Sequence, residues 1–260
     1  MNDLSNALEP YKLRARRHRG KALDALESGD AVHAQKEFEK AHRALAEALD
    51  HLRSLGVPDL EVAKPAREGE IAIAGQIADC HGMIGGIYRT EGKFSEAIQE
   101  YDKGYMYESS RRFNILNSYN RVNRLVLRIL DKPKLLFNPM PVGDVHPQEG
   151  KSMRQLLRDC AVEIDRQLRE GRADKAWALA DLALVRLLGG LEGVETALDA
   201  LDESAKDYFP YESMLKVIRD LTQKQLAVAG LVDVGERLRR KLPQSIQGEP
   251  LRGYPEVSAQ

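Results

Sequence analysis

The sequence contains few cysteines and no long apolar run. Its two cysteines, Cys80 and Cys160, lie far apart, whereas secreted disulfide-stabilised domains carry more cysteines at a higher density. Residues 1–9 lack the apolar core of a signal peptide, and the longest apolar runs are too short to cross a bilayer. We therefore expect a cytoplasmic protein that does not associate with a membrane.

Long runs of β-branched residues and a strong excess of one charge are also missing. Buried strands need such runs, whereas the abundant Ala, Leu, Glu, Arg and Lys residues favour helices. The formal net charge is −1, while nucleic-acid-binding proteins usually carry a clear basic excess. The composition predicts an all-α fold and argues against nucleic acid as the main partner.

A local basic excess remains in the first predicted helix. It is formed by Lys12, Arg14, Arg16, Arg17, His18, Arg19 and Lys21. In one interpretation this is a solvated helix face, balanced by acidic neighbours such as Glu27, Asp30, Glu37 and Glu39. The alternative interpretation is a surface that binds an anionic partner, including a nucleic acid.

Glycines punctuate the helical pattern. Gly29, Gly92 and Gly171 each separate two helical segments, which predicts a repeated arrangement of helix, tight turn and helix. The expected helices cover residues 11–28, 31–54, 70–91, 94–108, 110–130, 151–170, 172–188, 193–206, 211–229 and 232–241. These lengths and short connections predict antiparallel helix pairs that stack on one another.

Proline-rich stretches divide the chain. Residues 131–150 carry four prolines, which disfavour a helix interior and predict a linker or a loop pinned to the surface. We expect helical repeats at 1–130 and again at 151–242, followed by a disordered tail at 243–260 that is rich in Pro, Gly and polar residues. A shorter break at 56–70 makes the array irregular.

Residues 78–109 resemble a tetratricopeptide repeat, in which small residues let two helices approach while aromatic residues fill the surrounding space. The positions that carry the resemblance are Ile84, Gly85, Tyr88, Gly92, Phe94, Ala97, Tyr101 and Gly104. His81 and Ser109 replace the usual Trp and Pro. A second copy is carried by Ala22, Ala25, Gly29, Asp30, Ala34, Phe38 and Ala41, and a third is suggested by Gly171, Ala176, Ala180 and Ala183.

A separate resemblance covers residues 109–225, which are similar to the helical-repeat, TRAF-binding region of stress-activated kinase kinases and its bacterial relatives. It would place Trp177 on the first helix of a repeat. The two resemblances imply a non-catalytic scaffold or adaptor that binds a protein or peptide on a concave face. An alternative, which rests on family analogy alone, is a regulatory or sensor subunit of a bacterial signalling or defence system.

Four asparagines occur within ten residues, at 114, 117, 120 and 123. Asn is a poor helix former, whereas its amide can both donate to and accept from a peptide backbone. One hypothesis is therefore that Asn117, Asn120, Arg121 and Arg124 line an accessible groove for an acidic partner. The alternative is that the Asn-rich segment braces neighbouring loops.

The first helices of the two preceding pairs are expected to face the same groove. On them Arg16, Arg19, Asp79 and Arg89 can reach that concavity. The predicted partner-binding residues are Asn117, Asn120, Arg121, Arg124, Arg19 and Arg89.

The sequence predicts no enzyme. Cys80 and His81 are neighbours, so on a helix their side chains diverge by about 100° and do not form a nucleophile–base pair. The better interpretation of Cys80 is a packed core thiol. No zinc-binding spacing is present, and the GMIGG segment at 82–86 lacks the Lys and Ser/Thr of a phosphate loop. We expect no cofactor.

Overall fold

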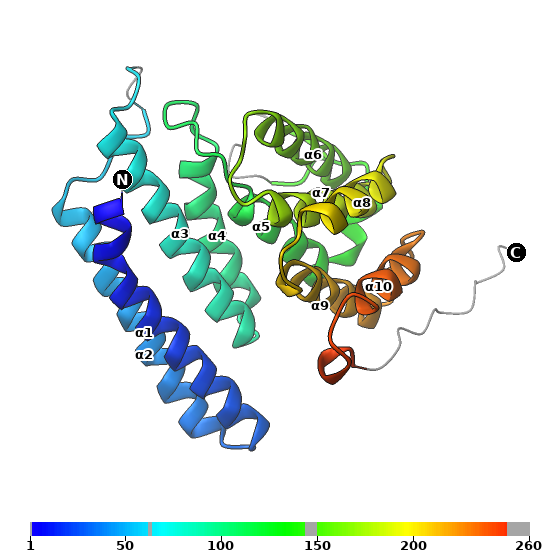
Figure 1. Cartoon of the computed structure of the whole chain (residues 1–260), viewed down its shortest axis with the longest axis horizontal. Helices are drawn as coiled ribbons and strands as arrows, with labels where there is room; N and C mark the ends of the chain where they lie inside the picture. Colours follow the sequence, from blue (N-terminus) through cyan, green and yellow to red (C-terminus); the bar gives the residue numbers. More distant parts are fainter. Residues whose placement is uncertain (1, 62–63, 144–149, 249–260) are drawn as a thin grey trace, which may run out of the picture. The chain divides into compact units, whose positions relative to one another are not determined.

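The computed structural model describes residues 2–61, 64–143 and 150–248 and shows an all-α protein in that part of the chain (Figure 1). Its described residues form ten α-helices and two short 3-10 helices, and no strand occurs among them. The α-helices are α1 (Asn2–Glu27), α2 (Ala31–Ser54), α3 (Glu68–Thr90), α4 (Phe94–Glu108), α5 (Tyr119–Asp131), α6 (Met153–Arg169), α7 (Lys175–Gly189), α8 (Val194–Ser204), α9 (Phe209–Gln223) and α10 (Leu231–Arg239). The 3-10 helices are η1 (Pro133–Leu136) and η3 (Gln244–Ile246).

The chain divides into two compact units, Met1–Arg124 and Leu125–Gln260. The boundary falls inside α5, whereas the composition changes only after residue 130. In the first unit α1 pairs with α2 and α3 pairs with α4, and the two pairs meet through α2 and α3 (Figure 1). The all-α class and the packing of neighbouring helices in pairs are as the sequence predicts.

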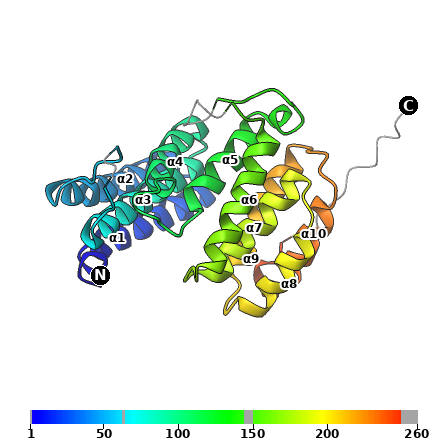
Figure 2. The same cartoon turned by 90° about the horizontal axis from the view of Figure 1, so that it is seen from above.

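The second unit is organised around α7, which packs against α6, α8 and α9, while α9 also pairs with α10 (Figure 2). Almost every α7 side chain from Ala178 to Gly189 is buried. Trp177, near the start of this helix, is 41% exposed. A helix that is apolar on all sides belongs in the middle of a bundle, and α7 occupies that position in its unit.

Two glycines set the turns of the first unit. Gly29 and Gly92 have φ values of +80° and +76°, a left-handed conformation that glycine adopts without steric cost. Each lies between the two helices of a pair, so the second helix of each pair can turn back along the first. The predicted turn positions are confirmed at both glycines.

The helices of the second pair approach closely because small residues face an aromatic ring. A Cβ atom on Gly85 of α3 would lie 2.9 Å from the ring of Tyr101 on α4. Ala97 on α4 is fully buried. This is the packing that the spacing of small and aromatic residues predicts.

Two predicted helix starts are wrong. The first helix begins at Asn2, because α1 continues through Pro10 and buries Leu8 completely. The helix expected from residue 110 begins only at Tyr119. Asn114 adopts a left-handed conformation with φ of +45°, and Asn117 accepts a hydrogen bond from the Tyr119 backbone N–H through Oδ1 at 3.0 Å. Asparagine side chains that bond to nearby backbone groups favour turns over helix, so this segment is irregular up to residue 118.

The predicted linker at 131–150 is partly anchored to the second unit. Leu136 is buried in η1, and its carbonyl accepts a bond from Arg154 Nε at 3.2 Å. The carbonyl of Gly143 accepts another bond from Arg128 at 2.9 Å. Residues 144–149 of this stretch, and residues 249–260 of the predicted disordered tail, lie outside the described residues. Within the described part, no helix is both long and apolar enough to cross a membrane.

Arg112 holds the break between the two pairs in place. Its guanidinium donates to the carbonyls of Asp59 and Lys64 at 2.6 and 3.1 Å and to Glu70 at 2.5 Å. The pKa of Glu70 is lowered to about 2, chiefly by the backbone N–H of Arg67 and then by Arg112, so this carboxylate stays ionised.

Replacement of Arg112 by alanine should loosen this break while leaving the helices formed, because its bonds are made to loop carbonyls and to the first turn of α3. We expect faster amide hydrogen exchange at residues 56–61 and at the start of α3, measured by mass spectrometry. Arg111, which is exposed, provides the control. Equal protection in the Arg112→Ala and Arg111→Ala variants would contradict this role.

Candidate functional site

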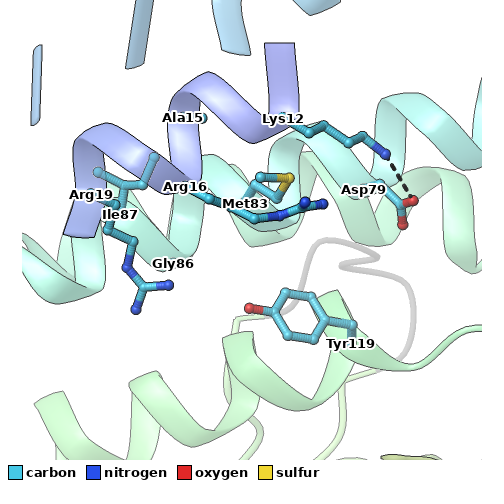
Figure 3. Close-up of a pocket in the computed structure, with 9 residues that line it drawn as sticks. All are labelled: Lys12, Ala15, Arg16, Arg19, Asp79, Met83, Gly86, Ile87 and Tyr119. Carbon is cyan, nitrogen blue, oxygen red and sulfur yellow. Dashed lines mark hydrogen bonds and ion pairs between the residues drawn. The ribbon is translucent and has the colours of Figure 1, made fainter. Parts of the chain in front are cut away.

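A pocket of about 370 Å³ lies between α1 and α3, and Tyr119 at the start of α5 forms one of its walls (Figure 3). All of its lining residues belong to the first unit. Four come from one face of α1, spaced i, i+3, i+4, i+7, and four from one face of α3, spaced i, i+4, i+7, i+8. The lining consists of Lys12, Ala15, Arg16, Arg19, Asp79, Met83, Gly86, Ile87 and Tyr119.

The basic side chains of the pocket differ in how they are paired. Lys12 is buried and donates to Gln76 Oε1 at 2.7 Å and to Asp79 Oδ2 at 3.4 Å. Arg16 bonds to Glu9 at 2.8 Å, but both side chains are about half exposed, and such surface pairs contribute little. The Lys12 end of the pocket is therefore nearly neutral.

Arg19 is the exception. Its guanidinium extends into the pocket on the side of Tyr119 (Figure 3). Within the described residues it makes no hydrogen bond and no ion pair, and its Nε is buried without a partner. A buried donor without a partner carries a desolvation cost, which an anion in the pocket would remove. Arg19 is therefore the group in this pocket best placed to hold a ligand.

Tyr119 is positioned by a second tyrosine from α4. Tyr101 is fully buried, and burial raises its pKa well above the usual value. The rings of Tyr101 and Tyr119 pack edge to face with centroids 5.9 Å apart. Both hydroxyls lie over Gly86, where a Cβ atom would be 3.5 Å from Tyr119 Oη and 3.7 Å from Tyr101 Oη. These are ordinary van der Waals distances, so Gly86 lies directly beneath the two hydroxyls.

The start of α5 is fixed by the buried carboxylate of Glu108. This carboxylate accepts bonds from the backbone N–H groups of Asn120 and Arg121, both at 3.2 Å, and from Asn120 Nδ2 at 2.8 Å. A carboxylate at the first turn of a helix satisfies free N–H groups and the helix dipole. Burial nevertheless dominates and raises the pKa of Glu108 to about 7.

Asn120 links three helices through one amide. Its Nδ2 also donates to the carbonyl of Ala78 in α3 at 3.0 Å. A Cβ atom on Gly104 of α4 would lie 2.4 Å from the Asn120 amide carbon, and one on Gly82 of α3 would lie 3.0 Å from Asn120 Oδ1. The side chain thus fills a space that exists because two facing positions are glycine.

These contacts correct part of the predicted site. Asn120 is fully buried and Arg124 is 1% exposed, so neither side chain lines an accessible groove. The guanidinium of Arg124 lies over the ring of Tyr105 at 3.8 Å and pairs with Asp102 at 3.4 Å. The physical reason is that α5 turns this face toward α3 and α4. Asn120 is a structural brace, but it joins α5 to α3 and α4 and not to the neighbouring loops of the alternative hypothesis.

The other predicted residues are dispersed. Asn117 precedes α5 and caps its first turn, and Arg121 lies 5.7 Å from the ring of Tyr105. Arg89 is close enough to Tyr101 for its charge to lower the tyrosine pKa slightly against the larger effect of burial, but it does not line the pocket. Arg16, Arg19 and Asp79 do line one pocket, as expected.

The predicted core thiol is buried. Cys80 is fully enclosed, and burial raises its pKa to about 11. Its neighbour His81 instead contacts Glu100 of α4, with Nδ1 at 2.7 Å from the carboxylate. The structure therefore directs these two side chains to different surroundings.

A repeated ion-pair triad was not recognised from the sequence. His18, Glu37 and Lys40 form one triad, with His18 Nδ1 at 2.7 Å and Lys40 Nζ at 2.5 Å from the carboxylate. An equivalent triad, with distances of 2.7 and 2.5 Å, is formed by His81, Glu100 and Lys103. Each member of the second triad follows its counterpart by 63 positions, the same offset that relates Gly29 to Gly92. The sequence feature that indicates this repeat is the spacing His-x18-Glu-x2-Lys, which occurs twice.

The basic face of α1 is largely compensated by acidic residues, although mostly not by those expected. Arg14 pairs with Glu47 at 2.5 Å, Arg16 with Glu9, and Lys12 with Asp79. Of the expected neighbours, Glu37 pairs with His18.

Comparison with known proteins identifies no relative. No protein-family model matches the chain, and no curated protein or solved structure matches it significantly.

Proposed function

We propose that this chain is a tetratricopeptide-type repeat protein that binds a segment of another protein between α1 and α3. The 63-residue offset supports the repeat assignment, because it relates the two glycine turns, the two ion-pair triads, and Phe38 to Tyr101. Repeats of this kind stack and leave one face of their first helices open. The pocket is built from the first helices of both pairs, which is the position expected for a partner.

The observation that carries the proposal is the guanidinium of Arg19 inside this pocket, which is unpaired among the residues that the structure describes. An arginine fork binds carboxylates through charge-assisted bonds that are stronger than neutral ones. Ala15, Met83 and Ile87 supply apolar surface beside it. A protein segment with acidic character fits this combination, and no catalytic group is required for that function.

A nucleic acid fits less well. The ion pairs of Lys12, Arg14 and Arg16 with Asp79, Glu47 and Glu9 reduce the positive charge of the α1 surface. Phosphate contacts depend on such charge, and each contact makes affinity fall further with salt.

The test is a comparison of two charge reversals on the same helix. Arg19→Glu places a carboxylate in the pocket, whereas Arg17→Glu makes the same change of charge at an exposed position outside it. Tagged full-length protein would capture partners from native cells for identification by mass spectrometry, and each purified candidate would then be titrated. We expect a partner whose affinity is lost with Arg19→Glu and retained with Arg17→Glu.

Two results would overturn the proposal. One is a partner that binds both charge-reversed proteins equally well. The other is a nucleic acid as the captured molecule, with an affinity that falls steeply with salt and weakens equally in both variants.

A further inference from the structure

We propose that the pocket binds one carboxylate, carried by an acidic side chain of the partner segment, through the Arg19 guanidinium and the Tyr119 hydroxyl together. This inference rests on the proposed function and specifies what the site recognises. Both groups extend into the same pocket from different helices, Arg19 from α1 and Tyr119 from the start of α5 (Figure 3).

Packing against the buried Tyr101 positions the hydroxyl of Tyr119. Burial raises the pKa of Tyr101 well above its usual value, so this buried phenol stays neutral. The Tyr119 ring packs edge to face against Tyr101, with centroids 5.9 Å apart, and its hydroxyl extends into the pocket (Figure 3). Since Tyr119 is 42% exposed and lines the pocket, this O–H is a donor for a bound group. Two donors, one of them charged, favour an anionic acceptor over an amide.

The opposite end of the pocket limits the ligand to one carboxylate. Asp79 lies seven residues before Gly86 on α3, about 10 Å along the helix axis, and its side chain is 43% exposed. Lys12 at this end already pairs with Asp79 at 3.4 Å, so it is not free to hold a second carboxylate. Asp79 can instead accept backbone N–H groups of a segment that continues past Met83. We therefore assign the carboxylate to a side chain within a continuing segment.

The pocket can be probed with small peptides and the full-length protein. The probes are acetyl-Leu-Glu-Leu-amide, its Gln counterpart as the neutral isostere, and acetyl-Leu-Leu-Leu with a free terminal carboxylate. Binding would be followed by chemical-shift titration. We expect the Glu peptide to bind at least about tenfold more tightly than the Gln peptide, since the difference is a set of charge-assisted bonds.

Variants assign the effect to the two side chains. Arg19→Met should remove the preference for Glu, and Tyr119→Phe should weaken Glu binding several-fold while leaving Gln binding unchanged. Arg17→Met is the matched control and should bind as the unmodified protein does. Arg19 makes no hydrogen bond or ion pair within the described residues, so Arg19→Met should keep the melting temperature of the unmodified protein, which circular dichroism would verify.

Three outcomes would overturn the inference: equal binding of the Glu and Gln peptides, tighter binding of the peptide with the free terminal carboxylate, or no effect of Arg19→Met. The proposed function fails separately. If Arg19→Glu still abolishes capture of the protein partner while the peptides show no preference for Glu, the groove binds a protein but does not read a carboxylate side chain.

Discussion

Replacing Gly104 by alanine should lower the free energy of unfolding of the first unit by about 3–5 kcal/mol. The new Cβ would lie 2.4 Å from the Asn120 amide carbon. Asn120 would have to move, and it would then lose its bonds to Glu108 and to the Ala78 carbonyl. The loss of stability therefore has two causes: overpacking around Asn120, and a buried Glu108 carboxylate that has lost a hydrogen-bond donor. Urea unfolding followed by circular dichroism would measure it.

Gly75 provides the control for this substitution. It also lies within a helix of the first unit, but no atom lies within 4 Å of the Cβ position. Gly75→Ala should therefore raise stability by up to about 1 kcal/mol, because alanine is the better helix former. If Gly104→Ala is as stable as Gly75→Ala, the contact with Asn120 does not require glycine at position 104.

A double substitution separates the two parts of the cost. Asn120→Ala removes the side chain that the new methyl group meets, so Gly104→Ala should cost much less in that background. Contacting residues are expected to show such non-additivity. Equal costs in the two backgrounds would place the strain elsewhere.

Replacing Glu108 by glutamine should remove a pH dependence of stability. Burial raises the pKa of Glu108 from 4.5 to about 7 in the folded protein, so the folded state binds this proton more tightly than the unfolded state does. The stability contributed by the protonated carboxyl is fully present below pH 4.5 and is lost as the pH rises to about 7. The loss amounts to at most about 3 kcal/mol, from the free energy of one pKa unit.

The measurement is the difference in unfolding free energy between the unmodified protein and Glu108→Gln, taken from urea titrations at several pH values. We expect the unfolding free energy of the variant, relative to that of the unmodified protein, to rise between pH 4.5 and 7 and to be constant outside that interval. Glu37→Gln is the control. Hydrogen bonds from Lys40 and then from His18 lower the pKa of Glu37 to about 2, so its contribution to stability is lost below pH 4.5 instead. A constant difference across the whole range for Glu108→Gln would show that this carboxyl does not titrate near neutral pH.

Local sequence patterns were enough to predict the helices and the turns between them. Gly29 and Gly92 mark the turns because no other residue adopts their backbone conformation as readily. The approach of α3 and α4 followed from the spacing of Gly85, Ala97 and Tyr101. These features depend on residues close in sequence, and for that reason they could be read without knowledge of the tertiary structure.

The start of α5 and the fate of Asn120 could not be predicted in this way. Both depend on a carboxylate 12 residues earlier and a carbonyl 42 residues earlier in the chain. Periodicity placed Asn117, Asn120 and Arg124 on one face of a helix, but it could not show that the helix begins after Asn117 or that the face turns inward. The Asn120 amide does not face a partner but donates to Glu108 and to the Ala78 carbonyl inside the protein.

The candidate pocket was partly predictable. Arg16, Arg19 and Asp79 were expected in one concavity because they lie on the first helices of neighbouring pairs. Tyr119 could not be predicted there, because its place in the pocket depends on its packing against Tyr101 in the tertiary structure. A single sequence without its structure gives no sign that two tyrosines 18 positions apart meet over a glycine.

The position of the single tryptophan gives the two units different optical signals. Trp177 belongs to the second unit, and the first unit contains no tryptophan. Because Trp177 is 41% exposed, its emission reports on the start of α7 in that unit. Tyrosine bands in the near-ultraviolet come mainly from the first unit, which holds six of the nine tyrosines. One denaturant titration recorded at both wavelengths would therefore distinguish a chain that melts as a whole from one whose halves melt independently.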